Sequence, residues 1–453
     1  MKTKDTLFIG LMLFALFFGA GNLIYPPFLG MEAGSSFWLA ISGFILTGVG
    51  LPILAIAAIA MVKGGAEGLA SRVHPLFSFV FISIVYLAIG PLFAIPRGAT
   101  VAYEMGLKPF VLGGPIESIG LLLFSITFFA VVYALSLNPT KIVDRVGQWL
   151  TPALLLAIVS LAVASYFNLE ASSYEPSNKY LSVPFFTGFL EGYLTMDTIA
   201  SLAFGLIVIN ALKEKGISNP KDLMKHSIIA GLIAGAGLAF VYVAIGMMGV
   251  KMVSYGTFEN GSAILSNGAE LLFGSSGKLL LGFIVLLACL TTCIGLTIAC
   301  SQYVTKKTTK IGYKTTVTII VLFSLFVSNL GLNQIISLSI PILVMVYPIT
   351  IVLVTLAFLH RLFNGKQMVY CGAILFTGLV SIFEGLIMYV KKISYLDTLL
   401  PYLENVFAQL LFSDLGLAWL IPAFVGGILG YCLDYLITNR NKVAKDTNSK
   451  KIA

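Results

Sequence analysis

The sequence predicts an all-α integral membrane protein with twelve transmembrane helices. Of its 453 residues, 58% are hydrophobic and only 11% are charged, whereas a soluble domain carries about 25% charged residues. Apolar runs of about 20 residues, the length at which a helix crosses a bilayer, recur along the whole chain. The alternation of a β-barrel is absent, and backbone groups in lipid must be hydrogen bonded internally. The spans are therefore helices.

The twelve predicted spans follow one another closely along the chain. They cover residues 6–30, 37–62, 76–104, 116–137, 146–168, 185–211, 223–250, 278–304, 314–331, 334–359, 368–390 and 415–438. We expect residues 1–439 to form the transmembrane domain. Residues 440–453 are expected to form a polar, mobile cytoplasmic tail whose lysines can contact anionic lipid. Met1–Phe18 has features of a signal peptide, but eleven further spans favour an uncleaved first helix.

Positive charges in the loops orient these spans. Of the 28 lysine and arginine residues, Arg97 lies within a span, and six lie in loops on one side: Lys108, Lys179, Lys251, Lys278, Lys391 and Lys392. All the others lie on the opposite side. Positive charge collects on the cytoplasmic side of a membrane, so we expect both termini to be cytoplasmic. A net charge of +8 distributed in this way gives no reason to expect a nucleic-acid partner.

The first and sixth spans are interrupted by residues that are unfavourable inside a helix. The first contains FGAGNLIYPP at residues 18–27, and the sixth reads FFTGFLEGYLTMDTIASLAFG at residues 185–205. The breaks lie five spans apart, so a second copy of a five-span repeat would enter the membrane from the opposite side. Corresponding broken helices in an inverted repeat indicate the binding site of a secondary transporter. We assign the repeats to residues 6–168 and 185–359, with helices 11 and 12 (368–438) outside them.

The first break offers backbone groups to a ligand. The half-helix after it presents free N–H groups and a positive dipole end, and the half before it ends in carbonyls from Ala15 to Phe18. Gly19 and Gly21 permit close approach and positive φ, and Asn22 adds a neutral donor and acceptor. A zwitterion fits such a site without any buried formal charge from the protein. The alternative is a packing kink in which the glycines seat a neighbouring helix.

Ionisable residues inside spans are functional candidates by default. Asp197 and Glu191 lie in or near the sixth-span break, where they could carry protons, join an ion site, or cap and pair structurally. For Arg97 we expect an ion pair with Glu104 or another outer acid, with gating as the alternative. Glu384 is expected to be structural, near the outer interface.

Nothing in the sequence indicates an enzyme. It contains no phosphate loop, no nucleophile–base pair and no cluster of metal-ligating side chains. The CLTTC spacing suits neither zinc nor a redox pair. We interpret all five cysteines as small core residues: Cys289, Cys293, Cys300, Cys371 and Cys432.

Four stretches resemble the branched-chain amino acid:cation symporters of bacteria. They are FFGAGNLIYPPFLG in the first span, GPLFAIPRGATVAYE in the third, EGYLTMDTIASLAFG in the sixth and ACLTTCIGLT in the eighth. Gly98 departs from the threonine expected after the Pro-Arg pair. The resemblance implies sodium-driven uptake of leucine, isoleucine and valine across the bacterial inner or plasma membrane. It also implies the five-plus-five inverted-repeat fold of the sodium-coupled leucine transporter.

The resemblance also implies a set of site residues. The substrate site combines residues of both breaks: Phe18, Gly19, Ala20, Gly21, Asn22, Gly192, Tyr193, Leu194 and Thr195. Tyr193 and Leu194 suggest an apolar substrate side chain. The sodium site would use the carbonyls of Ala15, Phe18 and Ala288 with the hydroxyls of Thr291 and Thr292. Phe17 aligns with a small residue, which argues against a second sodium site.

These observations predict a secondary active transporter that imports branched-chain amino acids by sodium symport through alternating access. Sodium is the coupling ion, and no cofactor is expected. One alternative is proton coupling through Asp197. A channel is a further alternative, although paired broken helices suit an occluding site better than the charged rings of a pore.

Overall fold

The computed structural model describes residues 3–110, 115–137, 142–170, 174–308, 310–392 and 400–452. Every regular element in these ranges is a helix. Eight helices are long and apolar enough to cross a membrane, or nine if the bent pair Pro184–Thr195 and Asp197–Glu214 is one span. Shorter apolar helices at Asp5–Phe17, Leu155–Asn168 and Tyr313–Ser328 lie on other predicted spans. The all-helical membrane class is confirmed, and the number of crossings stays a prediction.

The chain divides into two compact units. Unit 1 comprises Met1–Met61 and Ile84–Ile340, and unit 2 comprises Val62–Ser83 and Pro341–Ala453. The division falls within two helices, α6 (Pro75–Leu87) and α16 (Leu332–Leu359). The units do not correspond to the expected repeats, whose boundaries stay a prediction.

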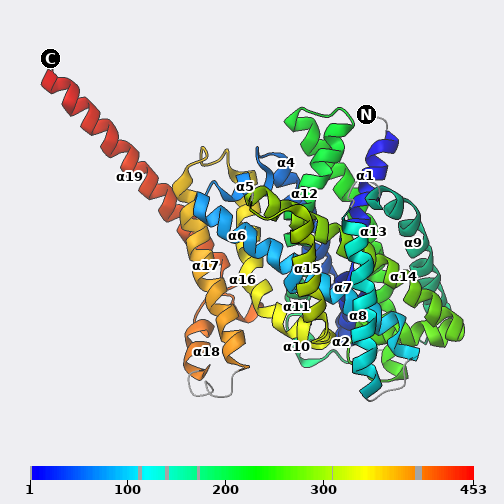
Figure 1. The fold of residues 1–453 in the computed structure, drawn as a ribbon. Helices are drawn as coiled ribbons and strands as arrows, with labels where there is room; N and C mark the ends of the chain where they lie inside the picture. Colours follow the sequence, from blue (N-terminus) through cyan, green and yellow to red (C-terminus); the bar gives the residue numbers. More distant parts are fainter. Residues whose placement is uncertain are drawn as a thin grey trace. The chain divides into compact units, whose positions relative to one another are not determined.

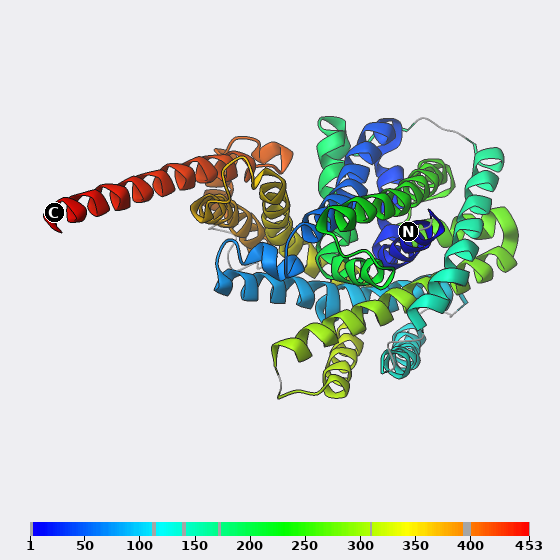
Figure 2. The ribbon, with the colours of Figure 1, turned by 90° about the horizontal axis from the view of Figure 1, so that it is seen from above.

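Unit 1 holds both predicted breaks. The α-helices that lie wholly within this unit are α1 (Thr3–Phe17), α2 (Ala20–Ala33), α3 (Phe37–Ile45), α4 (Leu51–Ala60), α7 (Ala94–Gly106), α8 (Pro115–Ser136), α9 (Ile142–Asn168), α10 (Asn178–Leu181), α11 (Pro184–Glu191), α12 (Asp197–Glu214), α13 (Pro220–Met252), α14 (Gly261–Lys307) and α15 (Tyr313–Ser328). Seen from above, α1 lies among the other helices of this unit, with α13 beside it (Figure 2). A helix that is apolar on every side is expected in such a central position.

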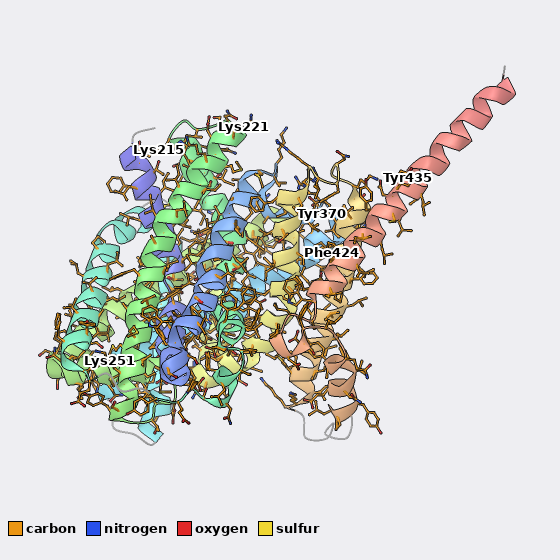
Figure 3. All side chains as sticks on the ribbon, turned by 180° about the vertical axis from the view of Figure 1, so that it is seen from behind. Lys215, Lys221, Lys251, Tyr370, Phe424 and Tyr435 are labelled. Atoms are coloured by element: carbon orange, nitrogen blue, oxygen red, sulfur yellow. The ribbon has the colours of Figure 1, made fainter. Side chains whose placement is uncertain are left out.

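The two ends of unit 1 carry different loops. Lys215 and Lys221 lie at one end, whereas Lys251, at the other end of α13, lies at the opposite end (Figure 3). The N-terminus of α1 is at the first of these ends, because Asp5 Oδ1 lies 3.6 Å from Lys215 Nζ. This arrangement separates the loops as the charge pattern predicted. Which end faces the cytoplasm stays a prediction.

A third break, which the sequence analysis missed, interrupts the predicted span 76–104. Between α6 and α7 lies a π-helical turn, η3 (Ala88–Leu92), in which Gly90 has non-helical torsions (φ −96°, ψ −121°). Pro91 follows it and has no N–H to continue the α-helical pattern. The Gly-Pro pair was the available signal. The break directs α7 along α14, where both helices contribute to the site described below.

The packing of α7 on α14 explains the departure at Gly98. A Cβ at this position would lie 2.4 Å from Cys293 Sγ, so the threonine expected there would collide with the cysteine. Cys289, Cys293 and Cys300 are buried as predicted, whereas Cys371 is half-buried and Cys432 is exposed. The interpretation as core residues is therefore wrong for Cys432, which lies on an outward face of its helix.

Unit 2 is built around α17 (Gln367–Val390) and α19 (Leu420–Ile452), which run side by side (Figure 1). Glycines allow the close approach, because a Cβ on Gly372 would lie 2.1 Å from the Gly426 carbonyl oxygen. Glu384 is half-buried in α17. The short helices α5 (Gly65–Ala70) and α18 (Leu400–Ala408) lie where loops were expected. Residues 440–452 continue α19 as a helix, and the polar, mobile cytoplasmic tail stays a prediction.

Candidate functional site

The first break is a short non-helical step at Phe18 and Gly19. α1 ends at Phe17 and α2 begins at Ala20, and Gly19 between them is extended (φ −125°, ψ −164°). The Gly19 N–H, which would continue α1 by bonding to the Ala15 carbonyl, donates instead to Asn22 Oδ1 at 3.2 Å. Asn22 therefore caps the start of α2. Neither Gly19 nor Gly21 adopts the positive φ that the sequence analysis allowed; their role is close approach.

The second break is a turn followed by a left-handed residue. After α11 the chain forms a 3-10 turn, η5 (Gly192–Thr195), and Met196 adopts φ 68° and ψ 7° before α12 begins at Asp197. The two halves are bent by 46°. Positive φ is uncommon for a residue with a side chain. The Thr195 hydroxyl bridges the turn, because it donates to the Gly192 carbonyl at 3.0 Å and accepts from the Asp197 N–H at 3.3 Å.

Both breaks line one small cavity, to which α7 and α14 also contribute. Its lining consists of Leu16, Phe17, Gly19, Ala20, Gly21, Asn22, Ile89, Ala94, Arg97, Thr195, Met196, Asp197, Ala200, Phe204, Thr292 and Leu296. A cavity of about 30 Å³ accommodates about two water molecules. A larger ligand would require the lining to move, and the lining includes both points at which a helix is interrupted.

Arg97 joins the two breaks. Its Nη1 donates to the Leu194 carbonyl at 2.7 Å and to the Tyr25 hydroxyl at 3.3 Å, and Nη2 donates to the Thr195 carbonyl at 3.2 Å. The guanidinium also lies over the Tyr25 ring, 5.6 Å from its centroid. Glu104 pairs instead with Lys108, at 3.1 Å on the same helix. The expected pairing of Arg97 with Glu104 is therefore wrong, because the break in η5 presents carbonyls that the arginine satisfies.

Asp197 lies opposite, at the start of α12. Its Oδ2 accepts a hydrogen bond from Asn22 Nδ2 at 2.6 Å and another from the Tyr242 hydroxyl at 3.1 Å. Asn22 Nδ2 also donates to the Tyr242 oxygen. All three residues are buried. The carboxylate lies at the positive end of α12, where capping is one of the roles that the sequence predicts for it, but its hydrogen bonds run to α2 and α13.

Of the two threonines assigned to the sodium site, one contacts the first break and the other bonds within its own helix. The Thr292 hydroxyl lies 3.3 Å from the Phe18 carbonyl oxygen, across the first break. The Thr291 hydroxyl bonds to the Ala288 carbonyl of its own helix at 2.8 Å. Ala15 lies in the last turn of α1. Among the described residues, no cluster of three or more His, Cys, Asp or Glu could hold a metal ion.

Of the nine residues assigned to the substrate site, Gly19, Ala20, Gly21, Asn22 and Thr195 line the cavity, and Phe18, Gly192, Tyr193 and Leu194 do not. Leu194 contributes its carbonyl to Arg97. Gly192 lies against η2 (Leu46–Gly50), where a Cβ would be 1.8 Å from Thr47 Oγ1. Phe17 lines the cavity and packs edge-on against Phe204.

The substrate site predicted from the sequence does not include Arg97, Met196, Asp197 or Tyr242. Arg97 lies in one of the stretches that carry the family resemblance, and Tyr242 is a polar aromatic residue inside an apolar span; both were available signals. Glu191 lies outside the cavity lining and pairs with Lys179 at 2.8 Å, which agrees with its structural interpretation.

Comparison with known proteins identifies the family. A family model described as branched-chain amino acid transport protein matches residues 2–437. The chain belongs to this family. It is 46% identical over 440 residues to the branched-chain amino acid permease BraB of Bacillus subtilis (strain 168), a match that covers 96% of this chain and 97% of that protein. It is 42% identical over 438 residues to the branched-chain amino acid transport system 2 carrier protein of Pseudomonas aeruginosa, covering 96% and 98%. The resemblance stated from the motifs is thereby confirmed, and the family is one of transporters, not enzymes.

Two solved structures share the fold at low identity. Mhp1, a nucleobase-cation-symport-1 family transporter in a closed conformation with bromovinylhydantoin bound, matches with a TM-score of 0.61 at 13% identity, covering 95% of this chain and 92% of that one. MhsT in complex with L-phenylalanine matches with a TM-score of 0.57 at 15% identity, covering 84% and 98%. Both likenesses support the predicted leucine-transporter-like fold.

Proposed function

We propose that this protein is a secondary active transporter that imports leucine, isoleucine and valine together with sodium. In this proposal the chain crosses the bacterial plasma membrane twelve times, with both termini in the cytoplasm. Ten of the helices form two inverted repeats of five, and the last two lie outside them. Relatives named as branched-chain amino acid permeases and carriers support the choice of substrate.

The observation that carries this proposal is the single cavity at which two interrupted helices meet. Interrupted helices expose backbone donors and acceptors, which inside a membrane are tolerated where they are buried in protein or line a polar cavity. The cavity is too small for an amino acid without movement of its lining. This fits alternating access, in which the halves around a central site rock or open in turn.

Sodium coupling rests on the neighbouring oxygens of Phe18 and Thr292, which connect α1 to α14 across the first break. A hard cation favours oxygen ligands. With the Ala15 and Ala288 carbonyls and the Thr291 hydroxyl, they would form an uncharged shell of oxygens. An ion bound there would favour one arrangement of the two helices, and substrate and sodium would then strengthen each other's binding by the same factor.

A second candidate is proton coupling through Asp197. A buried carboxylate in a membrane span is a functional candidate, and this one is bonded to Asn22 in the opposite break. In that mechanism Asp197 would gain and lose a proton as the cavity opens to either side.

Labelled leucine uptake into proteoliposomes separates these mechanisms. One sodium crossing with a neutral zwitterion moves one charge, worth about 2.3 kcal/mol per 100 mV, which at about 1.4 kcal/mol per tenfold supports roughly 40-fold accumulation. We expect uptake driven by an imposed sodium gradient and by a negative-inside potential. Uptake driven by a proton gradient with no sodium would favour Asp197 coupling. Leucine that equilibrates without accumulating under any gradient would indicate a channel.

A further inference from the structure

Two oppositely charged side chains line the small cavity between the breaks. Arg97 approaches from α7 and Asp197 from the start of α12, and they are 3% and 2% exposed. The sequence predicts a substrate site without buried formal charge from the protein. The structure differs, because α7 turns at the third break and brings an arginine to the carbonyls of η5.

The groups that hydrogen bond to each charge are uncharged, and its counter-charge in the cavity is the other side chain. Arg97 bonds to two carbonyls and a hydroxyl, and Asp197 accepts from an amide and a hydroxyl. The Arg97 Nε–H is buried and has no hydrogen-bond partner. A buried charge is costly unless it is paired, and a buried donor without a partner is costly as well. Each side chain therefore favours a ligand of the opposite charge.

In each break, residues close together in the sequence lie beside both Arg97 and Asp197. Arg97 Nη2 bonds to the Thr195 carbonyl, two residues before Asp197. It also lies 2.7 Å from where a Cβ on Gly21 would be. Asn22, the residue after Gly21, donates to Asp197. In the first break, Gly21 lies beside Arg97 and Asn22 bonds to Asp197. In the second, Thr195 bonds to Arg97 and lies two residues before Asp197.

We propose that Arg97 and Asp197 recognise the two ends of an amino-acid zwitterion, the arginine its α-carboxylate and the aspartate its α-ammonium. This inference rests on the proposed function and names the residues that would select an α-amino acid over an amine or an acid. A zwitterion brings an opposite charge to each side chain on neighbouring atoms, so the cavity is neutral overall both empty and filled. A molecule with only one of the two charges leaves the other side chain unpaired.

The competing explanation is that both residues only stabilise the break. Arg97 would then cap the carbonyl end of η5, and Asp197 would cap the positive end of α12. Such roles predict that substitution lowers stability or affinity for every ligand alike. Recognition of the zwitterion predicts a selective loss, and this difference decides between them.

The test is competition for binding of labelled leucine to the purified, full-length protein at saturating sodium. The competitors share the leucine side chain: leucine itself, 3-methylbutylamine without the carboxylate, and 4-methylpentanoate without the ammonium. For the unsubstituted protein we expect both analogues to bind about 10- to 100-fold more weakly than leucine. Removal of a charged hydrogen-bonding partner corresponds to roughly a 10- to 100-fold loss.

Two substitutions should remove one preference each. In Arg97→Gln, leucine should weaken about 10- to 100-fold while 3-methylbutylamine changes less than about threefold. In Asp197→Asn, leucine should weaken similarly while 4-methylpentanoate does not. As a result, 3-methylbutylamine approaches leucine in affinity in Arg97→Gln, and 4-methylpentanoate does so in Asp197→Asn. Homologous exchange with unlabelled leucine gives the reference affinity in each variant.

Controls separate a failed inference from a failed function. Glu104→Gln on the same helix as Arg97 should keep the wild-type profile. Tyr25→Phe should weaken leucine moderately without abolishing the preference over the amine, because it removes an Arg97 partner and no charge. If Arg97→Gln does not fold, the near-isosteric Asp197→Asn decides the question. Parallel loss of all three ligands, or an unchanged profile, would overturn the proposal. Absence of leucine binding in the unsubstituted protein would instead overturn the proposed function.

Discussion

The two helix breaks of unit 1 face the same cavity but are made in different ways. The first is a single extended glycine with an asparagine cap, and residues 18–22 carry no formal charge. The second has a left-handed methionine and a carboxylate, and its carbonyls bond to Arg97. The first break is therefore suited to backbone contacts with an ion and a substrate. The second contributes charge, and it depends on another helix for its hydrogen bonds.

The largest expected difference concerns how tightly two glycines are packed, Gly192 in the second break and Gly19 in the first. A Cβ at Gly192 in the second break would lie 1.8 Å from Thr47 Oγ1 and 2.9 Å from the Phe44 carbonyl oxygen. A Cβ at Gly19 in the first would lie 3.2 Å from a Thr292 methyl. Overpacking against backbone costs about 1–3 kcal/mol or more. We expect Gly192→Ala to lower the melting temperature in detergent clearly and Gly19→Ala to lower it much less.

Gly312→Ala is the matched control, because nothing lies within 4 Å of its Cβ position and its φ is −72°. It should leave the melting temperature nearly unchanged. An equal loss in Gly19→Ala and Gly192→Ala would mean that these two glycines are packed alike.

The second prediction concerns the hydrogen bond that joins the breaks. Asn22→Ala removes the donor to Asp197 Oδ2 and the cap on Gly19. A hydrogen bond to a charged group contributes about 1.5–3 kcal/mol, so we expect leucine affinity to fall by about tenfold or more in a protein that still inserts and folds. Tyr242→Phe removes one of two donors to the same oxygen and should cost less. Wild-type leucine affinity in folded Asn22→Ala would mean that the first break serves only the packing of neighbouring helices.

The sequence predicted the first break well, because glycine and asparagine act through local chemistry. The step falls at Phe18 and Gly19, whereas Pro26 and Pro27 of the same stretch lie inside α2. The apolar runs predicted the long apolar helices, and the number of crossings stays a prediction. The left-handed turn at Met196 carries no comparable local signal, since neither Gly nor Pro occurs there; it arises from the packing of Gly192 on Thr47 and from the bonds of Arg97.

The sequence predicts that Arg97 lies within a span and pairs with an acidic residue, because an acidic side chain is the partner that sequence patterns suggest for a buried arginine. Its actual acceptors are main-chain carbonyls made available by a break nearly 100 residues away. Its position also depends on the third break, whose Gly90–Pro91 signal was present but not interpreted. Local sequence patterns therefore could not predict the contacts between elements that are distant in the sequence.

The third prediction separates two adjacent hydroxyls. Thr292 reaches across to the Phe18 carbonyl of the first break, whereas Thr291 bonds within α14. Both were assigned to sodium, but only Thr292 connects the two helices. We expect Thr292→Val to raise the sodium concentration for half-maximal leucine uptake about tenfold, the effect of roughly 1.4 kcal/mol, and Thr291→Val to raise it less. Substrate affinity at saturating sodium should stay near normal in both.

Wild-type sodium dependence in both threonine variants would place the ion elsewhere. Proton coupling through Asp197 would then become the leading mechanism. Ala299, buried further along α14, offers a control as Ala299→Ser, which adds a hydroxyl away from the break.

The smallest expected effect lies where one lysine connects the ends of both broken helices. Lys179 of α10 contacts Glu32 at the end of α2 and Glu191 at the end of α11. Its side chain is 44% exposed, so each ion pair contributes only about 0.2–1 kcal/mol. Lys179→Gln should therefore lower the melting temperature slightly. The deficit should shrink in about 1 M choline chloride, where the screening length falls to about 3 Å.

The pH dependence of this contact has a definite sign. Partial burial opposes the charge of Lys179, yet Glu191 and Glu32 outweigh it and raise the pKa of the lysine above its usual value. A raised pKa means that the lysine's contribution is fully present below about pH 10.4, the value of an unperturbed lysine, and is lost only above it. The deficit of Lys179→Gln should thus be constant from pH 6 to 9. Lys215→Gln, which loses the exposed pair with Asp5 at the opposite end of unit 1, is the control. Lys215 pairs with one carboxylate, whereas Lys179 pairs with two. An equally large loss of melting temperature in Lys215→Gln would mean that the contact between the ends of α2 and α11 contributes no more than an ordinary surface ion pair.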